Sequence, residues 1–193
     1  MPRTLLLRGN RASTRFRELE QFCLEQKNLR IERAADGTIY IMSPTYSLTG
    51  KNNGEILIQL GLWNKREKHG YVSDSSSGFF LPNGAMRSPD VSFIPRQRWH
   101  TLSAADRAGF ARICPEFVVE LKSHTDTLSD LQQKMNEWRT NGCQLGWLID
   151  VTAETVYIYR AEGVDETRKG FDQNLSGEAI LPGFELELNE LKS

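Results

Sequence analysis

Phe117-Val118-Val119-Glu120-Leu121-Lys122 is the stretch that decides the fold of this 193-residue chain. It begins as a continuous apolar run of the kind that forms a buried strand, and it ends on a charged pair. Side chains alternate faces along a strand, so Glu120 and Lys122 point to one side while Leu121 points to the other. A carboxylate and an ammonium on one face of a hydrophobic strand are costly to bury without a partner or a function.

An upstream strand carries the other half of the pattern. Pro89-Asp90 opens the run Val91-Ser92-Phe93-Ile94, so Asp90 stands at the start of a predicted strand. Together with Glu120 and Lys122 it makes a PD…ExK pattern, which can place two carboxylates and an ammonium at one end of neighbouring strands. Spacing alone is a weak indication, because a bare PD…ExK arises by chance in many chains of this size. The context strengthens it, since the two halves fall on successive predicted strands and a helix follows at once.

Helical and strand periodicities alternate along the rest of the chain. Helices are predicted at 13–26, at 49–69 up to Gly70, and at 127–142, the last capped by Thr127 or Ser129. Strands are predicted at 29–33, 38–42, 71–73, 79–81, 145–149 and 155–159, with a last pair at 179–181 and 184–188. Residues 96–113 are predicted to form a loop with one short helix. The pattern predicts a mixed α/β domain that spans residues 1–193 as a single unit.

Composition excludes several classes of protein. The chain has 24 basic and 25 acidic residues and a formal net charge of -1, which argues against a protein that coats nucleic acid through bulk charge. The three cysteines lack CxxC spacing and the three histidines lack HxxxH or HExxH spacing, so neither a disulfide framework nor a zinc site is predicted. No apolar run approaches the ~18 residues of a membrane span, and no targeting segment is visible. We therefore expect a cytoplasmic protein with no membrane partner.

Asp90, Glu120 and Lys122 have the residue types that metal-dependent phosphodiester hydrolysis needs. Mg²⁺ is a hard cation that takes oxygen ligands and keeps several waters, so Asp90 and Glu120 would be its ligands, with Mn²⁺ as a substitute ion. The ion would polarise a phosphoryl oxygen and lower the pKa of a bound water, while Lys122 orients that water or neutralises developing charge. The alternative interpretation is structural: the carboxylates pair with an arginine at strand ends, and the lysine protects an edge strand.

Three further residues are weaker candidates for the same site. Glu55, near the start of the second predicted helix, can serve as a third metal ligand, although we favour slightly the interpretation that it complements the helix dipole. Lys134 lies on the helix after the Glu-x-Lys strand and can contact a substrate phosphate, yet an exposed helical lysine usually has no chemical role. Gln133 is a similar but weaker candidate for substrate binding.

Several blocks of the sequence resemble those of the Uma2 family (DUF820), restriction-endonuclease-like proteins that are abundant in cyanobacteria. The blocks are Ile31-Glu32 with Asp36-Gly37, Met42-Ser43-Pro44, Leu81-Pro82-Asn83-Gly84, Arg87-Ser88-Pro89-Asp90-Val91, Phe117 to Ser123, Asp126, Lys134, Asn141-Gly142, Gly146 to Asp150, and Leu181-Pro182-Gly183-Phe184. They occur in order over nearly the whole chain, which makes them far more specific than PD…ExK alone.

The resemblance implies a PD-(D/E)xK nuclease core with Asp90, Glu120 and Lys122 at the catalytic positions. It also implies a mixed α+β fold, in which helices flank a mixed central sheet and further strands lie towards both ends of the chain. Glu32 matches an acidic position in the family's first hairpin, where it can be assigned no role beyond support of the site.

The chain departs from that family at two places. Many relatives have Ser-Pro-Ser-Asp after the lysine, where this chain has Ser123-His124-Thr125-Asp126. Many also carry a histidine near Lys51 to Asn53, where this chain has none. The second difference bears on the identity of a third metal ligand.

Two functions follow as hypotheses. The first is a Mg²⁺-dependent DNA endonuclease, and the second is a non-catalytic nucleic-acid-binding or protein-interaction module that keeps the nuclease fold. The near-neutral charge favours the second. A third, purely structural interpretation makes Glu120 and Lys122 a buried ion pair. We expect a homodimer, because two DNA strands present two scissile bonds, with an interface near Trp99 or Phe110.

Overall fold

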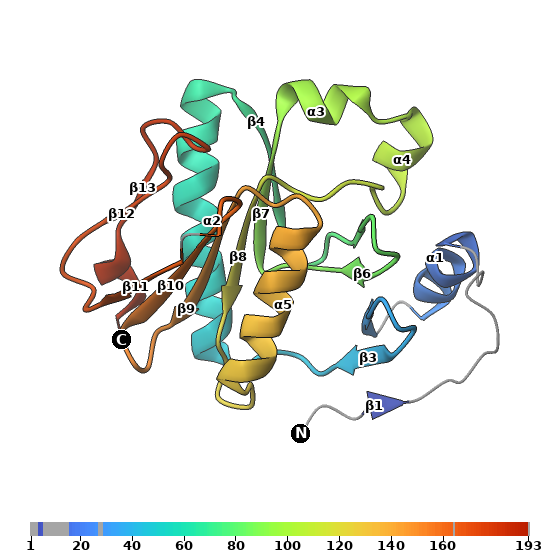
Figure 1. The fold of residues 1–193 in the computed structure, drawn as a ribbon, viewed down its shortest axis with the longest axis horizontal. Helices are drawn as coiled ribbons and strands as arrows, with labels where there is room; N and C mark the ends of the chain where they lie inside the picture. Colours follow the sequence, from blue (N-terminus) through green and yellow to red (C-terminus); the bar gives the residue numbers. More distant parts are fainter. Residues whose placement is uncertain (1–3, 6–15, 27–28, 164, 193) are drawn as a thin grey trace.

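A six-stranded mixed sheet forms the centre of the protein (Figure 1). The computed structural model describes residues 4–5, 16–26, 29–163 and 165–192. In spatial order the strands of this sheet are β11 (Glu166–Lys169), β10 (Thr155–Arg160), β9 (Leu145–Asp150), β8 (Phe117–Leu121), β7 (Val91–Pro95) and β4 (Gly70–Asp74). The β8–β9 pair is parallel and the other four pairs are antiparallel.

The parallel β8–β9 pair follows from the helix that connects the two strands, α5 (Leu128–Thr140). Two parallel strands need a crossover, and α5 makes it by packing Met135 and Trp138 onto one face of the sheet. The side chain of Thr127 accepts a hydrogen bond from the backbone N–H of Asp130, which confirms Thr127 as the N-cap.

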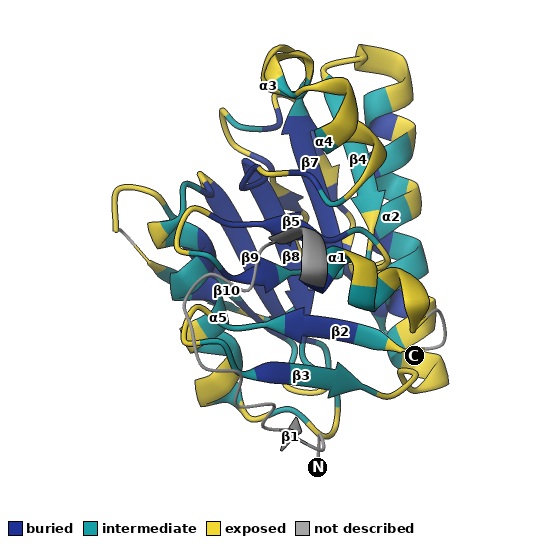
Figure 2. Ribbon diagram, turned by 90° about the vertical axis from the view of Figure 1, so that its right-hand side faces the viewer, coloured by how far each residue is buried: buried dark blue, intermediate teal, exposed yellow. Residues whose placement is uncertain are grey.

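The opposite face of the sheet is covered by α2 (Ser47–Glu67), which buries Ile56, Leu60 and Trp63 against it. The C-terminal segment completes this layer with a two-stranded sheet of β12 (Leu175–Ser176) and β13 (Glu185–Leu186), followed by the 3-10 helix η1 (Leu188–Leu191). Because helices lie on both faces, every residue of β8 and β9 is buried (Figure 2). No helix in the described part of the chain is long and apolar enough to cross a membrane.

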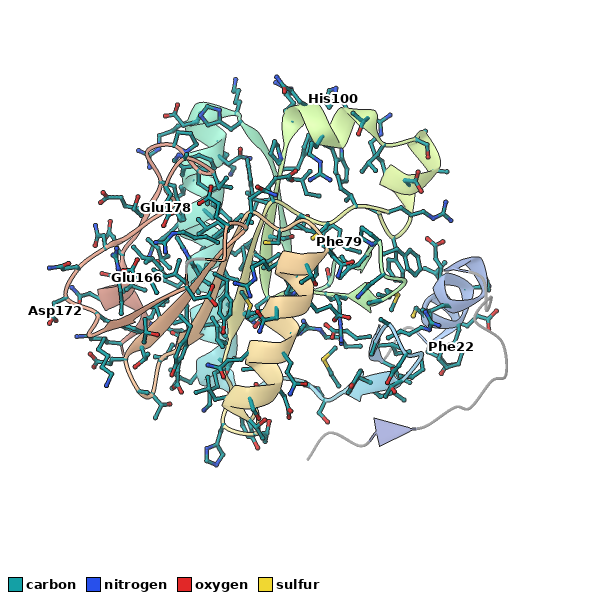
Figure 3. All side chains as sticks on the ribbon, viewed as in Figure 1. Phe22, Phe79, His100, Glu166, Asp172 and Glu178 are labelled. Atoms are coloured by element: carbon teal, nitrogen blue, oxygen red, sulfur yellow. The ribbon has the colours of Figure 1, made fainter. Side chains whose placement is uncertain are left out.

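A second, five-stranded sheet lies beside the central one, and its strands come from the first half of the chain. Its order is β1 (Thr4–Leu5), β3 (Ile39–Met42), β2 (Arg30–Arg33), β6 (Met86–Arg87) and β5 (Phe79–Phe80). The helix α1 (Phe16–Glu25) packs on this sheet, with Phe22 against a small apolar cluster that includes Ile31 and Ile39 (Figure 3). The chain then crosses from β6 into β7, which joins the two sheets directly before Asp90.

The predicted mixed α+β class is confirmed, but several element predictions need correction. Residues 96–113 contain two short helices, α3 (Arg96–Thr101) and α4 (Ala104–Ala108), instead of one. The strand predicted at 79–81 is shorter, Phe79–Phe80, and it belongs to the second sheet, whereas the strand before it belongs to the central sheet. The last strand pair joins 175–176 with 185–186, so the strand predicted at 179–181 is wrong, and β11 was not predicted. The predicted start of the first helix, residues 13–15, lies outside the described residues.

Candidate active site

Asp90 lies at the edge of the central sheet where β7 begins and β8 ends. The two strands are antiparallel, and their register pairs Val91 with Val119, which places Asp90 opposite Glu120. The carboxylate Oδ2 of Asp90 accepts a hydrogen bond of 2.8 Å from the backbone N–H of Leu121, the central residue of the Glu-x-Lys motif. The Asp90 side chain of one half of the PD…ExK pattern is therefore hydrogen-bonded to the backbone of the other half.

Two side chains that the sequence pattern does not indicate also reach Asp90. Asn53, in the first half of α2, donates from Nδ2 to Oδ1 of Asp90 at 3.1 Å. Because the carboxylate needs a donor, the amide nitrogen faces it, and the amide oxygen of Asn53 stays buried without a hydrogen-bond partner. Arg30 on β2 lies 3.8 Å from the same Oδ1.

Glu120 is buried at 3% exposure, on the face of β8 that α5 covers. Its Oε1 accepts a hydrogen bond from Trp138 Nε1 at 2.8 Å. The ammonium of Lys134 lies 2.9 Å from Oε1 and 3.1 Å from Oε2. Trp138 and Lys134 both belong to α5, so this helix fixes the orientation of the carboxylate.

Lys134 also contacts a second buried carboxylate, Glu32 on β2, at 3.0 Å. Glu32 in turn accepts hydrogen bonds from the backbone N–H of Ser88 at 3.0 Å and from Arg87 at 3.1 Å. Arg87 completes the network with a 2.6 Å contact to Glu137. The ammonium of Lys134, which the sequence offered as a possible contact for a substrate phosphate, is thus engaged by two carboxylates of the protein.

The sequence contains a signal for this placement of Lys134. Lys134 lies three residues after Leu131 and four residues before Trp138, which puts it within the apolar stripe of α5 and not on the solvent face. Arg30 and Glu32 carry a comparable signal, since residues two apart on a strand share one face.

The two buried glutamates have different pKa values because their neighbours differ. Burial raises the pKa of Glu120 to about 7, with a further increase from Asp90 and Glu32, while Lys134 opposes the rise. Burial also acts on Glu32, but Lys134, Arg87 and the Ser88 N–H outweigh it and lower the pKa of Glu32 below its usual value. The carboxylates on either side hold the pKa of Lys134 above that of an ordinary lysine, although burial opposes this.

Lys122 follows β8 directly and lies at the same sheet edge as Asp90. Its ammonium is 3.4 Å from Oδ2 of Asp150, the last residue of β9, and its side chain is 22% exposed. Since β8 and β9 are parallel, their ends meet at one edge, so Asp150 is the partner that the topology supplies. The ion-pair partners of Glu120 and Lys122 are thus Lys134 and Asp150, and the hypothesis that these two residues pair with each other is wrong.

Glu55 and Gln133 do not join this group of side chains. Glu55 accepts a hydrogen bond of 3.0 Å from Gln59 on its own helix, and α2 begins at Ser47, so Glu55 lies more than two turns from the helix start and not in the first turn as predicted. Gln133 is exposed on α5. Among the described residues, no three His, Cys, Asp or Glu side chains form a group that could hold a metal ion.

The donor atoms around Asp90 nevertheless have the chemistry that a hard divalent cation prefers. Asp90 and Glu120 lie opposite each other on adjacent strands, and the amide of Asn53, whose nitrogen contacts Asp90, carries an unpartnered oxygen. All three groups are oxygen donors, as Mg²⁺ and Mn²⁺ require. The residue types fit such an ion through the carboxylates of Asp90 and Glu120, whereas the predicted third ligand, Glu55, is hydrogen-bonded to Gln59 on its own helix.

Comparison with known proteins relates both the fold and the sequence of this chain to a family of proteins. The fold is similar to that of the crystal structure of a "putative nuclease belonging to DUF820" from Anabaena variabilis ATCC 29413, with a TM-score of 0.72 and 18% sequence identity over 83% of this chain and 88% of that chain. The family model of Uma2, described as "Putative restriction endonuclease", matches residues 16–189. The chain therefore belongs to the Uma2 family. No curated protein matches it.

Proposed function

We propose that this protein is an endonuclease that hydrolyses phosphodiester bonds of DNA with a divalent metal ion, Mg²⁺ or Mn²⁺, by a PD-(D/E)xK mechanism. The observation that carries the proposal is the hydrogen bond from the Leu121 backbone to Asp90, because it fixes Asp90 against the Glu120-x-Lys122 strand. Membership of a family described as "Putative restriction endonuclease" supports nuclease-like chemistry.

Each residue at the sheet edge has a separate task in this proposal. Asp90 and Glu120 would hold the metal ion, and the amide oxygen of Asn53 would be a further donor once the amide group rotates, because its nitrogen now faces Asp90. When bound, the ion would polarise the scissile phosphate and lower the pKa of a coordinated water. Lys122, restrained by Asp150 but partly exposed, would contact the phosphate or hold the attacking water through a charge-assisted hydrogen bond.

Cleavage of supercoiled plasmid DNA tests this proposal. Purified protein is incubated with Mg²⁺, Mn²⁺ or EDTA, and we expect metal-dependent nicking that falls by about 100-fold or more in Asp90→Asn and Lys122→Met. Glu55→Gln is the matched control, since it neutralises a carboxylate that is bonded to Gln59 and lies apart from Asp90. Cleavage by Asp90→Asn at the parent rate would show that the site is wrongly assigned.

A second candidate function is a non-catalytic module for binding nucleic acid or protein. The observation in its favour is that the protein supplies its own cations to the candidate ligands, Arg30 at Asp90 and Lys134 at Glu120. Calorimetric titration with Mn²⁺ separates the two functions. A folded parent protein that neither binds Mn²⁺ nor cuts DNA favours the module.

We also propose that the protein acts as a homodimer in the cytoplasm. The aromatic residues that the sequence suggested as an interface, Trp99 and Phe110, are half-buried and pack on Tyr71 and Phe80 of the same chain. Better support comes from α2, where Leu48, Ile58 and Leu62 are 49–56% exposed. Light scattering during gel filtration tests this: a monomer mass at micromolar concentration would contradict the dimer.

A further inference from the structure

The strand β2 sends side chains to both halves of the candidate site. Arg30 and Glu32 are two residues apart and lie on the same face of the strand. Arg30 approaches Asp90, while Glu32 holds Lys134 at 3.0 Å, and Lys134 in turn holds Glu120 at 2.9 Å. A single strand of the second sheet thus fixes the charge environment of both carboxylates that would bind metal.

The hydrogen-bond donors of the Lys134 ammonium are all used by carboxylate oxygens. A lysine ammonium has three N–H donors, and three carboxylate oxygens lie around Nζ at 2.9–3.1 Å, two from Glu120 and one from Glu32. A magnesium ion bound to Glu120 would lie about 2.1 Å from the ligating oxygen. It would therefore stand next to a positive charge on the same carboxylate, in a region where burial weakens solvent screening.

Lys134 is also restrained from leaving. Glu32 is fixed by Ser88 and Arg87, and Glu120 is fixed by Trp138. Movement of the ammonium away from this position would leave two buried carboxylates without their shared cation, which is costly. The lysine therefore acts as a built-in counter-ion of Glu120.

We propose that Lys134 is a positioning residue that competes with a divalent metal ion for Glu120 and thereby weakens metal binding at this site. The inference rests on the proposed function for the assignment of Glu120 as a ligand. It gives α5 and β2 a specific task, which is to set the metal concentration at which the site fills.

Calorimetric titration with Mn²⁺ tests this inference in the full-length protein. Lys134→Met removes the charge and keeps most of the side-chain volume, and we expect the Kd for Mn²⁺ to fall by about tenfold or more. Lys65→Met is the matched control, because it removes the same charge from an exposed position at the end of α2. We expect its Kd to stay within about twofold of the parent value, because an exposed charge is screened by solvent and salt.

A second variant guards against loss of the fold. Lys134→Met combined with Glu32→Gln removes a cation and its anionic partner together, so the net charge of the cluster is unchanged, and circular dichroism and thermal unfolding check both variants. If Lys134→Met does not fold, the double variant decides. Tighter Mn²⁺ binding in the folded variant supports competition, whereas equal or weaker binding overturns it.

The outcomes separate this inference from the proposed function. If the parent protein binds no Mn²⁺ but Lys134→Met does, the result would support competition between Lys134 and the metal ion. The same result would contradict the proposal that the parent is a metal-dependent enzyme. Metal-dependent cleavage by the parent, with no tighter binding in the folded variants, would support the enzyme and overturn the competition.

Discussion

Glu120 gives the protein a pH dependence at the scale of one residue. Its pKa is raised to about 7, chiefly by burial, and a carboxyl group must lose its proton to bind metal. The affinity for Mn²⁺ should therefore fall as the pH drops below 7, by about tenfold between pH 8 and pH 6. Near pH 6 binding should release about one proton per ion, which calorimetry in buffers of different ionisation enthalpy measures. Glu120→Gln lacks the carboxyl group that releases this proton. Mn²⁺ binding by the parent protein that does not depend on pH would contradict the prediction.

The sequence predicts some residues of the site and not others for a physical reason. Asp90, Glu120 and Lys122 are placed by strand alternation, which depends only on local geometry. The contacts of Asn53 and Arg30 with Asp90 depend on how α2 and the second sheet pack against β7, and no local pattern encodes that packing. Residue types and the buried faces of strands and helices at the site were therefore predictable from the sequence, whereas the pairing of one charged group with another across elements was not.

At the scale of elements, the end of α2 offers a test of backbone strain. Lys68 caps this helix with a φ of 55° and donates its N–H to the Asn64 carbonyl at 2.7 Å. A side chain in this left-handed region costs roughly 1 kcal/mol, which glycine avoids. We expect Lys68→Gly to raise the free energy of unfolding by about 0.5–1 kcal/mol in urea titrations.

Glu67→Gly is the comparison for this change, because it places glycine inside the last turn and should lower stability by about 1 kcal/mol. A Lys68→Gly variant that is no more stable than the parent would show that the cap is not strained.

The same helix end shows why element boundaries are hard to predict. The sequence suggested that Gly70 stops α2, but Gly70 is the first residue of β4. A Cβ at this position would collide with the Ile94 carbonyl and the Phe93 ring, so glycine is needed for strand contact and not for the cap. β11 escaped prediction for another reason: its sequence is Glu-Thr-Arg-Lys, and it has no apolar period to detect.

At the scale of the whole molecule, the two sheets differ in how well they are covered. Every residue of β8 and β9 is buried, whereas β2 and β3 are each partly exposed. We expect backbone amides of β8 and β9 to exchange with deuterium most slowly, since opening them requires the whole core to unfold.

Arg87 links the second sheet to α5, the helix that packs on the central sheet, and provides the corresponding mutational test. It lies on β6 and contacts Glu32 of β2 and Glu137 of α5. Arg87→Met leaves these carboxylates with fewer donors, so it should lower stability by about 3 kcal/mol and speed exchange in the second sheet more than in β8 and β9. Arg168→Met is the control, because its partner Glu166 lies on the opposite side of the molecule from α1 (Figure 3). Equal acceleration in both sheets would mean that they unfold as one cooperative unit, and that Arg87 does not specifically hold the second sheet in place.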